Sequence, residues 1–294
     1  MTAPRSAPTV LQIVLGRRLA LLRDGAGLTA AEAATRVRVD QTTITRMEKA
    51  ETSLKWATVK ALLELYGAGP AETEEFLALT EQANAPGWWQ SFRDVLPSWF
   101  GVHVSLEGAA ARIHTYEPQV IPGLLQTKEY AHAVLRSGLP RVTADVVERR
   151  VSLRLKRQDI LTRTEPEPPR LWAVMDETCL RRTVGSRAVM CGQIDQLLRM
   201  AELPNVTLRI CPFEAGLHPG GFGPFTVFRF EIPELPDVVC VDTLSRGQYS
   251  EDPEEVALFR EALDHMSTYA LSSARTRQFL MDVRDELTRS TSPR

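Results

Sequence analysis

The feature of this sequence that most restricts its fold is a pair of short helical segments near the N-terminus. Thr29 followed by Glu32 forms a capping box, which predicts a helix over residues 30–37. Asp40 offers a second N-cap, and the next helix is predicted from residue 41 to about residue 49. Two helices joined by so short a turn must cross at a steep angle, so few folds accommodate them.

Apolar and small residues lie where a helix-turn-helix motif requires them. Ala34 is small at the position where the two helices would touch, and Val37 and Val39 flank the turn. Ile44 and Met47 direct the apolar face of the second helix towards the first. The segment is therefore predicted to form a helix-turn-helix.

The outer face of the second helix carries short polar side chains and one arginine: Gln41, Thr42, Thr43, Thr45 and Arg46. Side chains of these types bind base edges and phosphates in the major groove. The first 70 residues contain ten Arg or Lys and six Asp or Glu, a net charge of +4 in a chain whose total is −2. This basic module is expected to bind double-stranded DNA.

Several residues of the motif resemble the Cro/C1-type, or XRE-type, repressor module: Leu28-Thr29, Val39 and Ile44-Thr45-Arg46-Met47-Glu48. The resemblance implies a five-helix domain whose residues 41–46 enter the major groove. By the same resemblance, the base-facing residues are Gln41, Thr42, Thr45 and Arg46, and Arg38 and Lys49 contact phosphates. Thr29 is also predicted to be one of the DNA-binding residues.

The segment departs from that module at three positions. Ala30 replaces a common glutamine, which removes a contact that positions the DNA backbone. Arg38 and Ala50 stand where the family commonly has glycine. An arginine in a turn that needs a positive φ costs about 1 kcal/mol of strain, unless this turn is built differently.

Periodicity and proline-rich breaks divide the chain into five predicted parts: a disordered tail (1–9), the helix-turn-helix domain (10–85), a helical connecting region (86–163), a stiff linker (164–169) and an α/β domain (170–294). The last part is expected to follow the order strand, helix, three strands, helix, with a further C-terminal helix. The predicted fold class is therefore multi-domain. An all-α five-helix domain precedes a helical segment and an α/β (α+β) domain.

Further along the chain, four short stretches look like landmarks of one actinobacterial regulator family: residues 86–89, 116–127, 203–206 and 223–226. That family joins an XRE module to a conserved domain of poorly defined role, and it is described as antitoxin-like. The resemblance implies a small protein partner encoded nearby.

Three segments each permit two interpretations. Residues 116–127 form either a rigid packed corner, which we favour, or a partner-binding groove. The glycine-rich residues 218–224 form a hairpin connection, which we favour, or an anion-binding or lid loop. The basic residues 149–157 form the solvated face of an amphipathic helix, which we favour, or a dimer contact.

The sequence provides no pattern for membrane insertion, secretion, metal binding or catalysis. It lacks both a long apolar run and a signal-peptide layout, so a cytoplasmic location is expected. Its four cysteines are widely separated, with no histidine at ligand spacing, so no zinc site is expected. Without a nucleophile–base order or paired carboxylates, we expect no enzymatic activity and no cofactor.

The leading hypothesis is a transcriptional regulator that binds DNA as a homodimer, since paired half-sites require two copies. Its C-terminal region would then sense an effector or a protein partner. The alternative is an antitoxin-like protein-binding module that touches DNA only to regulate its own gene.

Overall fold

The computed structural model describes residues 9–85, 87–138, 141–232, 235–243 and 246–289. Within it the chain divides into two compact units. The first comprises residues 1–93, 97–109 and 232–236, and the second comprises residues 94–96, 110–231 and 237–294. Most of the predicted tail lies outside the described residues. Thr9 does not belong to a tail, because its side chain forms a capping box with Gln12 at the start of the first helix.

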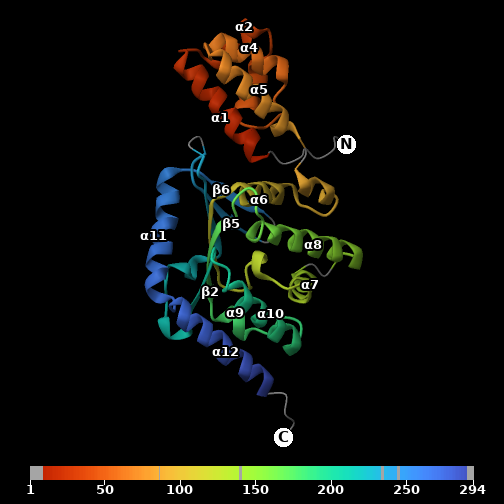
Figure 1. The fold of residues 1–294 in the computed structure, drawn as a ribbon, viewed down its shortest axis with the longest axis vertical. Helices are drawn as coiled ribbons and strands as arrows, with labels where there is room; N and C mark the ends of the chain where they lie inside the picture. Colours follow the sequence, from red (N-terminus) through yellow and green to blue (C-terminus); the bar gives the residue numbers. More distant parts are fainter. Residues whose placement is uncertain (1–8, 86, 139–140, 233–234, 244–245, 290–294) are drawn as a thin grey trace. The chain divides into compact units, whose positions relative to one another are not determined.

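Five helices form most of the first unit (Figure 1), as the sequence predicted: α1 (Val10–Gly25), α2 (Ala30–Val37), α3 (Gln41–Glu48), α4 (Trp56–Tyr66) and α5 (Pro70–Asn84). Their ends follow from local chemistry. Gly67 ends α4 in the left-handed conformation that glycine adopts without strain, and Pro70 opens α5 at a position that needs no N–H donor. A short 3₁₀ helix, η1 (Trp88–Phe92), and α6 (Ser98–Ala109) complete the unit.

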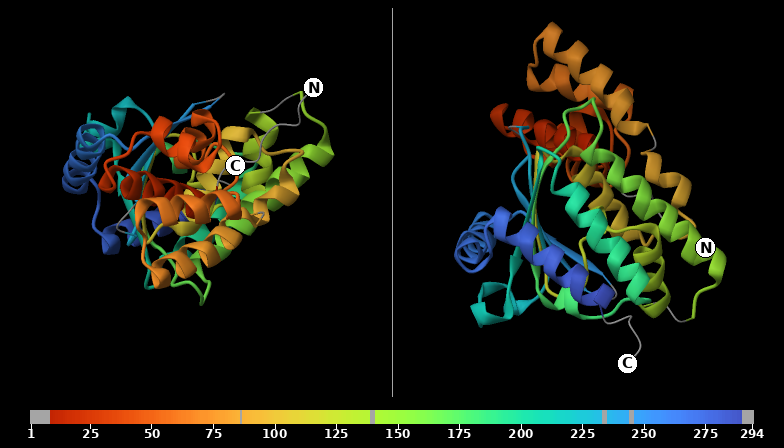
Figure 2. Two further views of the ribbon diagram at one scale, coloured as in Figure 1. Left: turned by 90° about the horizontal axis from the view of Figure 1, so that it is seen from above. Right: turned by 60° about the horizontal axis from the view of Figure 1, so that its bottom comes forward.

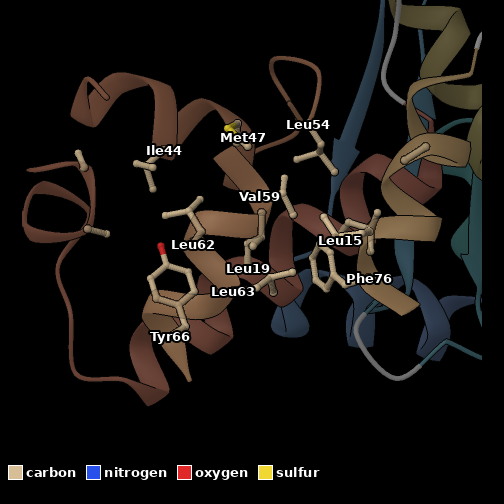
Figure 3. Packing of buried hydrophobic residues seen from close by; sticks show 14 residues of the cluster. Leu15, Leu19, Ile44, Met47, Leu54, Val59, Leu62, Leu63, Tyr66 and Phe76 are labelled. Atoms are coloured by element: carbon tan, nitrogen blue, oxygen red, sulfur yellow. The ribbon is translucent and has the colours of Figure 1, made fainter. Parts of the chain in front are cut away.

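The core of this unit is one cluster of buried side chains to which α1 to α5 all contribute. Figure 3 shows Ile44 and Met47 of α3 directed at side chains of α4 such as Leu62. Leu15 and Leu19 of α1 and Phe76 of α5 complete the same cluster. The sequence-predicted roles of Ile44 and Met47 are therefore confirmed.

The second unit contains a mixed six-stranded sheet with the order β3-β2-β1-β4-β5-β6. The strands are β1 (Arg112–Glu117), β2 (Arg170–Asp176), β3 (Val206–Cys211), β4 (Phe225–Arg229), β5 (Val238–Asp242) and β6 (Gly247–Ser250). Strands β1, β2 and β3 are parallel, and β4, β5 and β6 join antiparallel. The multi-domain fold class with an α+β C-terminal part is confirmed.

Two strands were not predicted, and one of them changes the division of the chain. Strand β1 lies inside the predicted helical connecting region 86–163, yet it pairs with β2 beyond the linker. The structure therefore divides the chain differently from the predicted ranges 86–163 and 170–294. The polar residues His114 and Thr115 interrupt the apolar run expected of a central parallel strand, which hides β1 in the sequence.

Helices cover both faces of the sheet (Figure 2). Helix α11 (Pro253–Tyr269) packs Leu263 and Met266 against Tyr116, Val174 and Phe225 on one face. The opposite face carries the crossover helices of the parallel strands: α7 (Lys128–Gly138), α8 (Ala144–Arg157) and α10 (Arg187–Met200). Helix α12 (Ser273–Arg289) contacts α10 and β3, and the four-residue α9 (Thr178–Arg181) follows β2.

Residues 116–127 form the rigid corner that the sequence favoured. The backbone of Ile121 is held by the hydroxyl of Tyr130 and the amide of Gln126, at 3.2 and 2.6 Å. Gln193 accepts from the N–H of Thr127 and donates to the carbonyl of Leu125, both at 2.7 Å. Side chains thus satisfy buried backbone groups of this corner that the sheet does not pair.

Of two other sequence interpretations, the hairpin at residues 218–224 is wrong and the solvated face of residues 149–157 holds only in part. Residues 218–224 cannot close a hairpin, because β3 and β4 are not neighbours; the chain crosses the ends of β2 and β1, where His218 lies near Asp176. The basic segment of α8 is not simply a solvated face. Arg157 is buried, and Arg149 forms a bidentate ion pair with Asp94.

Over the described residues, no helix combines the length and apolar character needed to cross a membrane. The four cysteines are unpaired; Cys179, Cys211 and Cys240 are buried, and Cys191 is half-buried.

Candidate nucleic-acid interface

The turn between α2 and α3 is built by local interactions. The hydroxyl of Thr29 accepts from the N–H of Glu32 at 3.2 Å, and the Glu32 carboxylate accepts from the N–H of Thr29 at 2.8 Å. At the other end of α2, Arg38 adopts the left-handed conformation, with φ 58°. Asp40 then occupies the N-cap of α3, although its side chain makes no capping hydrogen bond. The turn therefore has the geometry that glycine usually provides, with an arginine in its place.

Helix α3 exposes a polar face on the side away from its buried residues. Ile44 and Met47 are buried, and on a helix of 3.6 residues per turn the opposite face is centred on Thr42, Thr45, Arg46 and Lys49. Gln41 and Thr43 lie at the flanks of this face, and Thr43 is half-buried while Gln41 is exposed. The predicted base-reading residues thus share one accessible surface.

Two side chains of this face are held by contacts within the unit. The hydroxyl of Thr45 donates to the carbonyl oxygen of Gln41 at 3.2 Å. The guanidinium of Arg46 donates to the carbonyl oxygen of Glu51 at 3.4 Å and lies 4.0 Å from the Glu51 carboxylate. Contact with a base edge would require Arg46 to exchange these weak contacts for stronger ones.

The other predicted contacts lie outside α3. Arg38 and Lys49 are exposed at the ends of α2 and α3, as phosphate contacts require. Thr29 is also exposed, but its hydroxyl already donates to Glu32 at 2.8 Å while it caps α2. The observed role of Thr29 is to start α2, which positions the turn.

A close approach of α1 to α3 depends on a glycine that the sequence reasoning missed. A Cβ atom at Gly16 would lie 2.6 Å from the carbonyl oxygen of Glu48 and 2.7 Å from that of Met47. Both atoms belong to backbone, which cannot move aside cheaply. Gly16 therefore sets the distance between α1 and the end of α3. A glycine inside an amphipathic helix is the sequence signal for such an approach.

An ion pair that the sequence also did not reveal joins α1 to α3. Arg23 Nε lies 2.7 Å from Glu48 Oε1, and both side chains are largely buried. Another nitrogen of Arg23 donates to the carbonyl oxygen of Leu28 at 2.8 Å. The hydrogen bond with Glu48, ahead of the opposing effect of burial, raises the pKa of Arg23. Because the partners are 25 residues apart, no local pattern indicates the pair.

Comparison with known families agrees with this geometry. Residues 14–76 match a family model described as a helix-turn-helix domain, which indicates a DNA-binding regulator. Residues 100–282 match a second model, described as a domain of unknown function (DUF5753). No curated protein and no solved structure matches the chain. Since the second match covers more than half of its residues, the chain belongs to the DUF5753 family, and it carries a helix-turn-helix domain ahead of that region.

Proposed function

We propose that this protein is a sequence-specific transcriptional regulator whose helix α3 enters the major groove of DNA. The observation that carries the proposal is the polar face of Thr42, Thr45, Arg46 and Lys49, which lies opposite the buried Ile44 and Met47; Thr42 and Lys49 are exposed, and Thr45 and Arg46 are half-buried. Gly16 and the Arg23–Glu48 pair support it, because they hold α3 in a defined position. Base reading requires such preorganisation, since each bidentate contact depends on precise geometry.

The backbone supports assignment to the Cro/C1-type, or XRE-type, modules in particular. Arg38 and Ala50 are the non-glycine residues with positive φ, at 58° and 54°, in the described part of the chain. These are the two positions at which the resembled module commonly has glycine. We extend the proposal to the actinobacterial antitoxin-like family with that module, and to a cytoplasmic location.

Two copies of the protein would read the two halves of an operator, so the proposal includes a homodimer. It also includes an effector or partner that acts on the second unit and changes the spacing of the two DNA-binding domains. The large sheet with helices on both faces suits such a role, because it provides a rigid scaffold for a binding site.

The test is genome-wide occupancy of the tagged protein, compared between the wild type and Arg46→Ala. We expect a few sharp peaks that disappear with Arg46→Ala, and operator binding in vitro that is weaker by about 10- to 100-fold. Lys60→Ala is the matched control, since Lys60 is an exposed basic residue on α4 rather than α3. Peaks that persist unchanged in Arg46→Ala would contradict the proposal.

The antitoxin-like alternative is favoured by one observation in the second unit. Between β3 and β4, the large apolar side chains of Leu217 and Phe222 are 86% and 98% exposed, and Phe213 is exposed as well. Exposed apolar side chains that gather on one loop are typical of protein contacts. A small protein that co-purifies with the wild type but not with Leu217→Ser/Phe222→Ser, together with DNA occupancy confined to the protein's own promoter, would favour this function.

A further inference from the structure

Exposed apolar side chains gather in one part of the second unit. Seven large ones are exposed among the described residues, and only two of them, Leu21 and Trp56, belong to the first unit. The other five lie on the loop between β3 and β4 or on α11, which this loop contacts (Figure 1): Phe213, Leu217, Phe222, Leu258 and Tyr269. Single apolar residues are common on protein surfaces, whereas a group of them in one place marks a site of contact with another molecule.

The loop between β3 and β4 is held in place by buried polar side chains. At its start, the carboxylate of the buried Glu177 accepts from the N–H of Phe213 at 2.9 Å. Further along, Nδ1 of the buried His218 accepts from the N–H of Gly220 at 3.2 Å, while its Nε2 lies 3.7 Å from Oδ2 of Asp176. These contacts fix the backbone from which the exposed apolar side chains project.

Packing fixes the same loop a second time. A Cβ atom at Gly220 would lie 2.4 Å from Cζ of Tyr116, so the loop backbone rests directly on that ring. The ring of His218 meets the Tyr116 ring edge-on, with the centroids 5.7 Å apart. Because the loop is already ordered, a partner that contacts Leu217 and Phe222 would lose little conformational entropy in ordering it.

One stripe of α11 extends this apolar surface. Leu258, Ala262, His265 and Tyr269 are spaced by four, three and four residues, which places them on one side of the helix. Leu258 and Tyr269 are exposed, and Ala262 is half-buried. The Tyr269 ring lies 6.1 Å from the ring of His218, so the stripe meets the loop at the C-terminal end of the helix. The docking surface is defined by both parts: Leu217, Phe222, Leu258, Ala262, His265 and Tyr269.

Exposed acidic side chains accompany the docking surface. They lie on α11 and on the loop itself: Glu214, Glu254, Glu255, Glu261 and Asp264. Arg260 is the one arginine of α11, which has no lysine, and it lies 3.9 Å from the carboxylate of Asp237. The charge beside the docking surface is therefore negative. Such a surface favours a partner whose apolar residues are flanked by Lys or Arg.

We propose that the docking surface binds a basic amphipathic helix of another protein. The apolar side of that helix covers Leu217, Phe222 and the stripe of α11, and its Lys and Arg residues face Glu261 and Asp264. The bound segment is a helix because neither the described loop nor α11 offers a strand edge, so the segment must satisfy its own backbone. That this helix belongs to the partner of the antitoxin-like alternative rests on the proposed function, whereas binding itself does not.

The test is a fluorescence anisotropy titration of the full chain with two labelled synthetic peptides. Both peptides form amphipathic helices with the same leucine stripe, and their polar positions are lysine in one and glutamate in the other. We expect saturable binding of the lysine peptide and at least about tenfold weaker binding of the glutamate peptide. Leu217→Ser/Phe222→Ser should weaken binding of the lysine peptide by at least about tenfold, because it removes exposed apolar contacts and keeps every charge.

Leu21→Ser is the matched control, since it removes an exposed leucine from the first unit and should bind the lysine peptide as the wild type does. Equal binding of the lysine peptide by Leu217→Ser/Phe222→Ser and the wild type would overturn the proposal, because charge alone would then explain the attraction. Equal binding of the two peptides by the wild type would overturn it as well, and so would the absence of binding up to millimolar concentration.

The oligomeric state of the same variants separates this proposal from contact between two copies of the chain. A dimer that dissociates in Leu217→Ser/Phe222→Ser during sedimentation, with neither peptide bound by the wild type, would overturn the proposal in favour of an interface between copies. Operator binding by this double variant should equal that of the wild type, because both changes lie in the second unit. A failure of the docking surface is therefore distinguishable from a failure of the DNA-binding function.

Discussion

The guanidinium of Arg23 and the carboxylate of Glu48 form a two-pronged ion pair, with Nε–Oε1 at 2.7 Å and Nη2–Oε2 at 3.2 Å. The pair joins the last turn of α1 to the last residue of α3. It therefore connects the helix that presents the polar face to the scaffold that carries it. An ion pair with little solvent access tolerates the loss of one partner poorly, because the other charge is left buried.

Removing either partner alone should lower the free energy of unfolding by about 3 kcal/mol. We expect this loss in Arg23→Met and in Glu48→Met, measured by urea unfolding of the full chain. The double variant should lose less than the two single variants combined, because no unpaired charge then remains. Additive losses in this double-mutant cycle would contradict a coupled pair.

Gly16→Ala should destabilise the first unit by about 1–3 kcal/mol, although alanine favours helix formation. The reason is that the new Cβ atom would press on the carbonyl oxygens of Met47 and Glu48 and push α3 away from α1. Thermal unfolding and operator affinity should both fall. Gly25→Ala is the control in the same helix, because nothing lies within 4 Å of a Cβ atom there. A stabilised Gly16→Ala variant would show that the close approach has no cost.

Arg38→Gly should raise the free energy of unfolding by up to about 1 kcal/mol, since it relieves a left-handed residue that is not glycine. Arg36→Gly makes the same change two residues earlier, inside α2, and should instead destabilise by about 1 kcal/mol. Chemical denaturation of the two variants measures the difference. If both lose stability equally, the turn does not carry strain.

The stability of the protein should fall as the pH rises from about 5 to about 8, owing to Glu117. In this range the unfolded carboxyl ionises, whereas burial and the neighbouring Asp242 raise its folded pKa to about 8 despite the opposing charge of Arg154. The folded state then binds more protons than the unfolded state, so stability falls by up to about 1.4 kcal/mol per pH unit from this group.

Glu117→Gln removes that contribution, and the slope of unfolding free energy against pH should flatten over the same range. Glu129→Gln, an exposed change on α7, should keep the wild-type slope. Urea unfolding across this pH range compares the three proteins. An unchanged slope in Glu117→Gln would mean that the group does not titrate as its surroundings indicate.

Much of the first unit could be predicted because its elements are local. Capping at Thr29, the glycine after Tyr66 and the spacing of Ile44 and Met47 each act within one or two turns of helix. The ends of α2 and α3 and the buried face of α3 were accordingly predicted almost to the residue. The contact between Gly16 and the end of α3 could not be, because it depends on how two whole helices cross.

The second unit was less predictable for the same reason. The sequence of strand β1 is short and largely polar, so it does not resemble a central strand. Its central position follows only from its pairing with β2 and β4. The basic residues of α8 look like a solvated face, yet Arg157 is buried once the helix covers the sheet. Neither result follows from periodicity, since both depend on partners many residues away.

The sequence by itself determined the helix-turn-helix, because capping, turn conformation and amphipathic spacing are short-range properties of the chain. Tertiary structure alone decided what fixes α3, where β1 lies, and that Arg157 of α8 is buried. The physical reason is that burial and charge pairing arise between segments that the chain brings together only on folding. Burial and charge pairing of this kind cannot be predicted from a residue's type and its neighbours in the sequence.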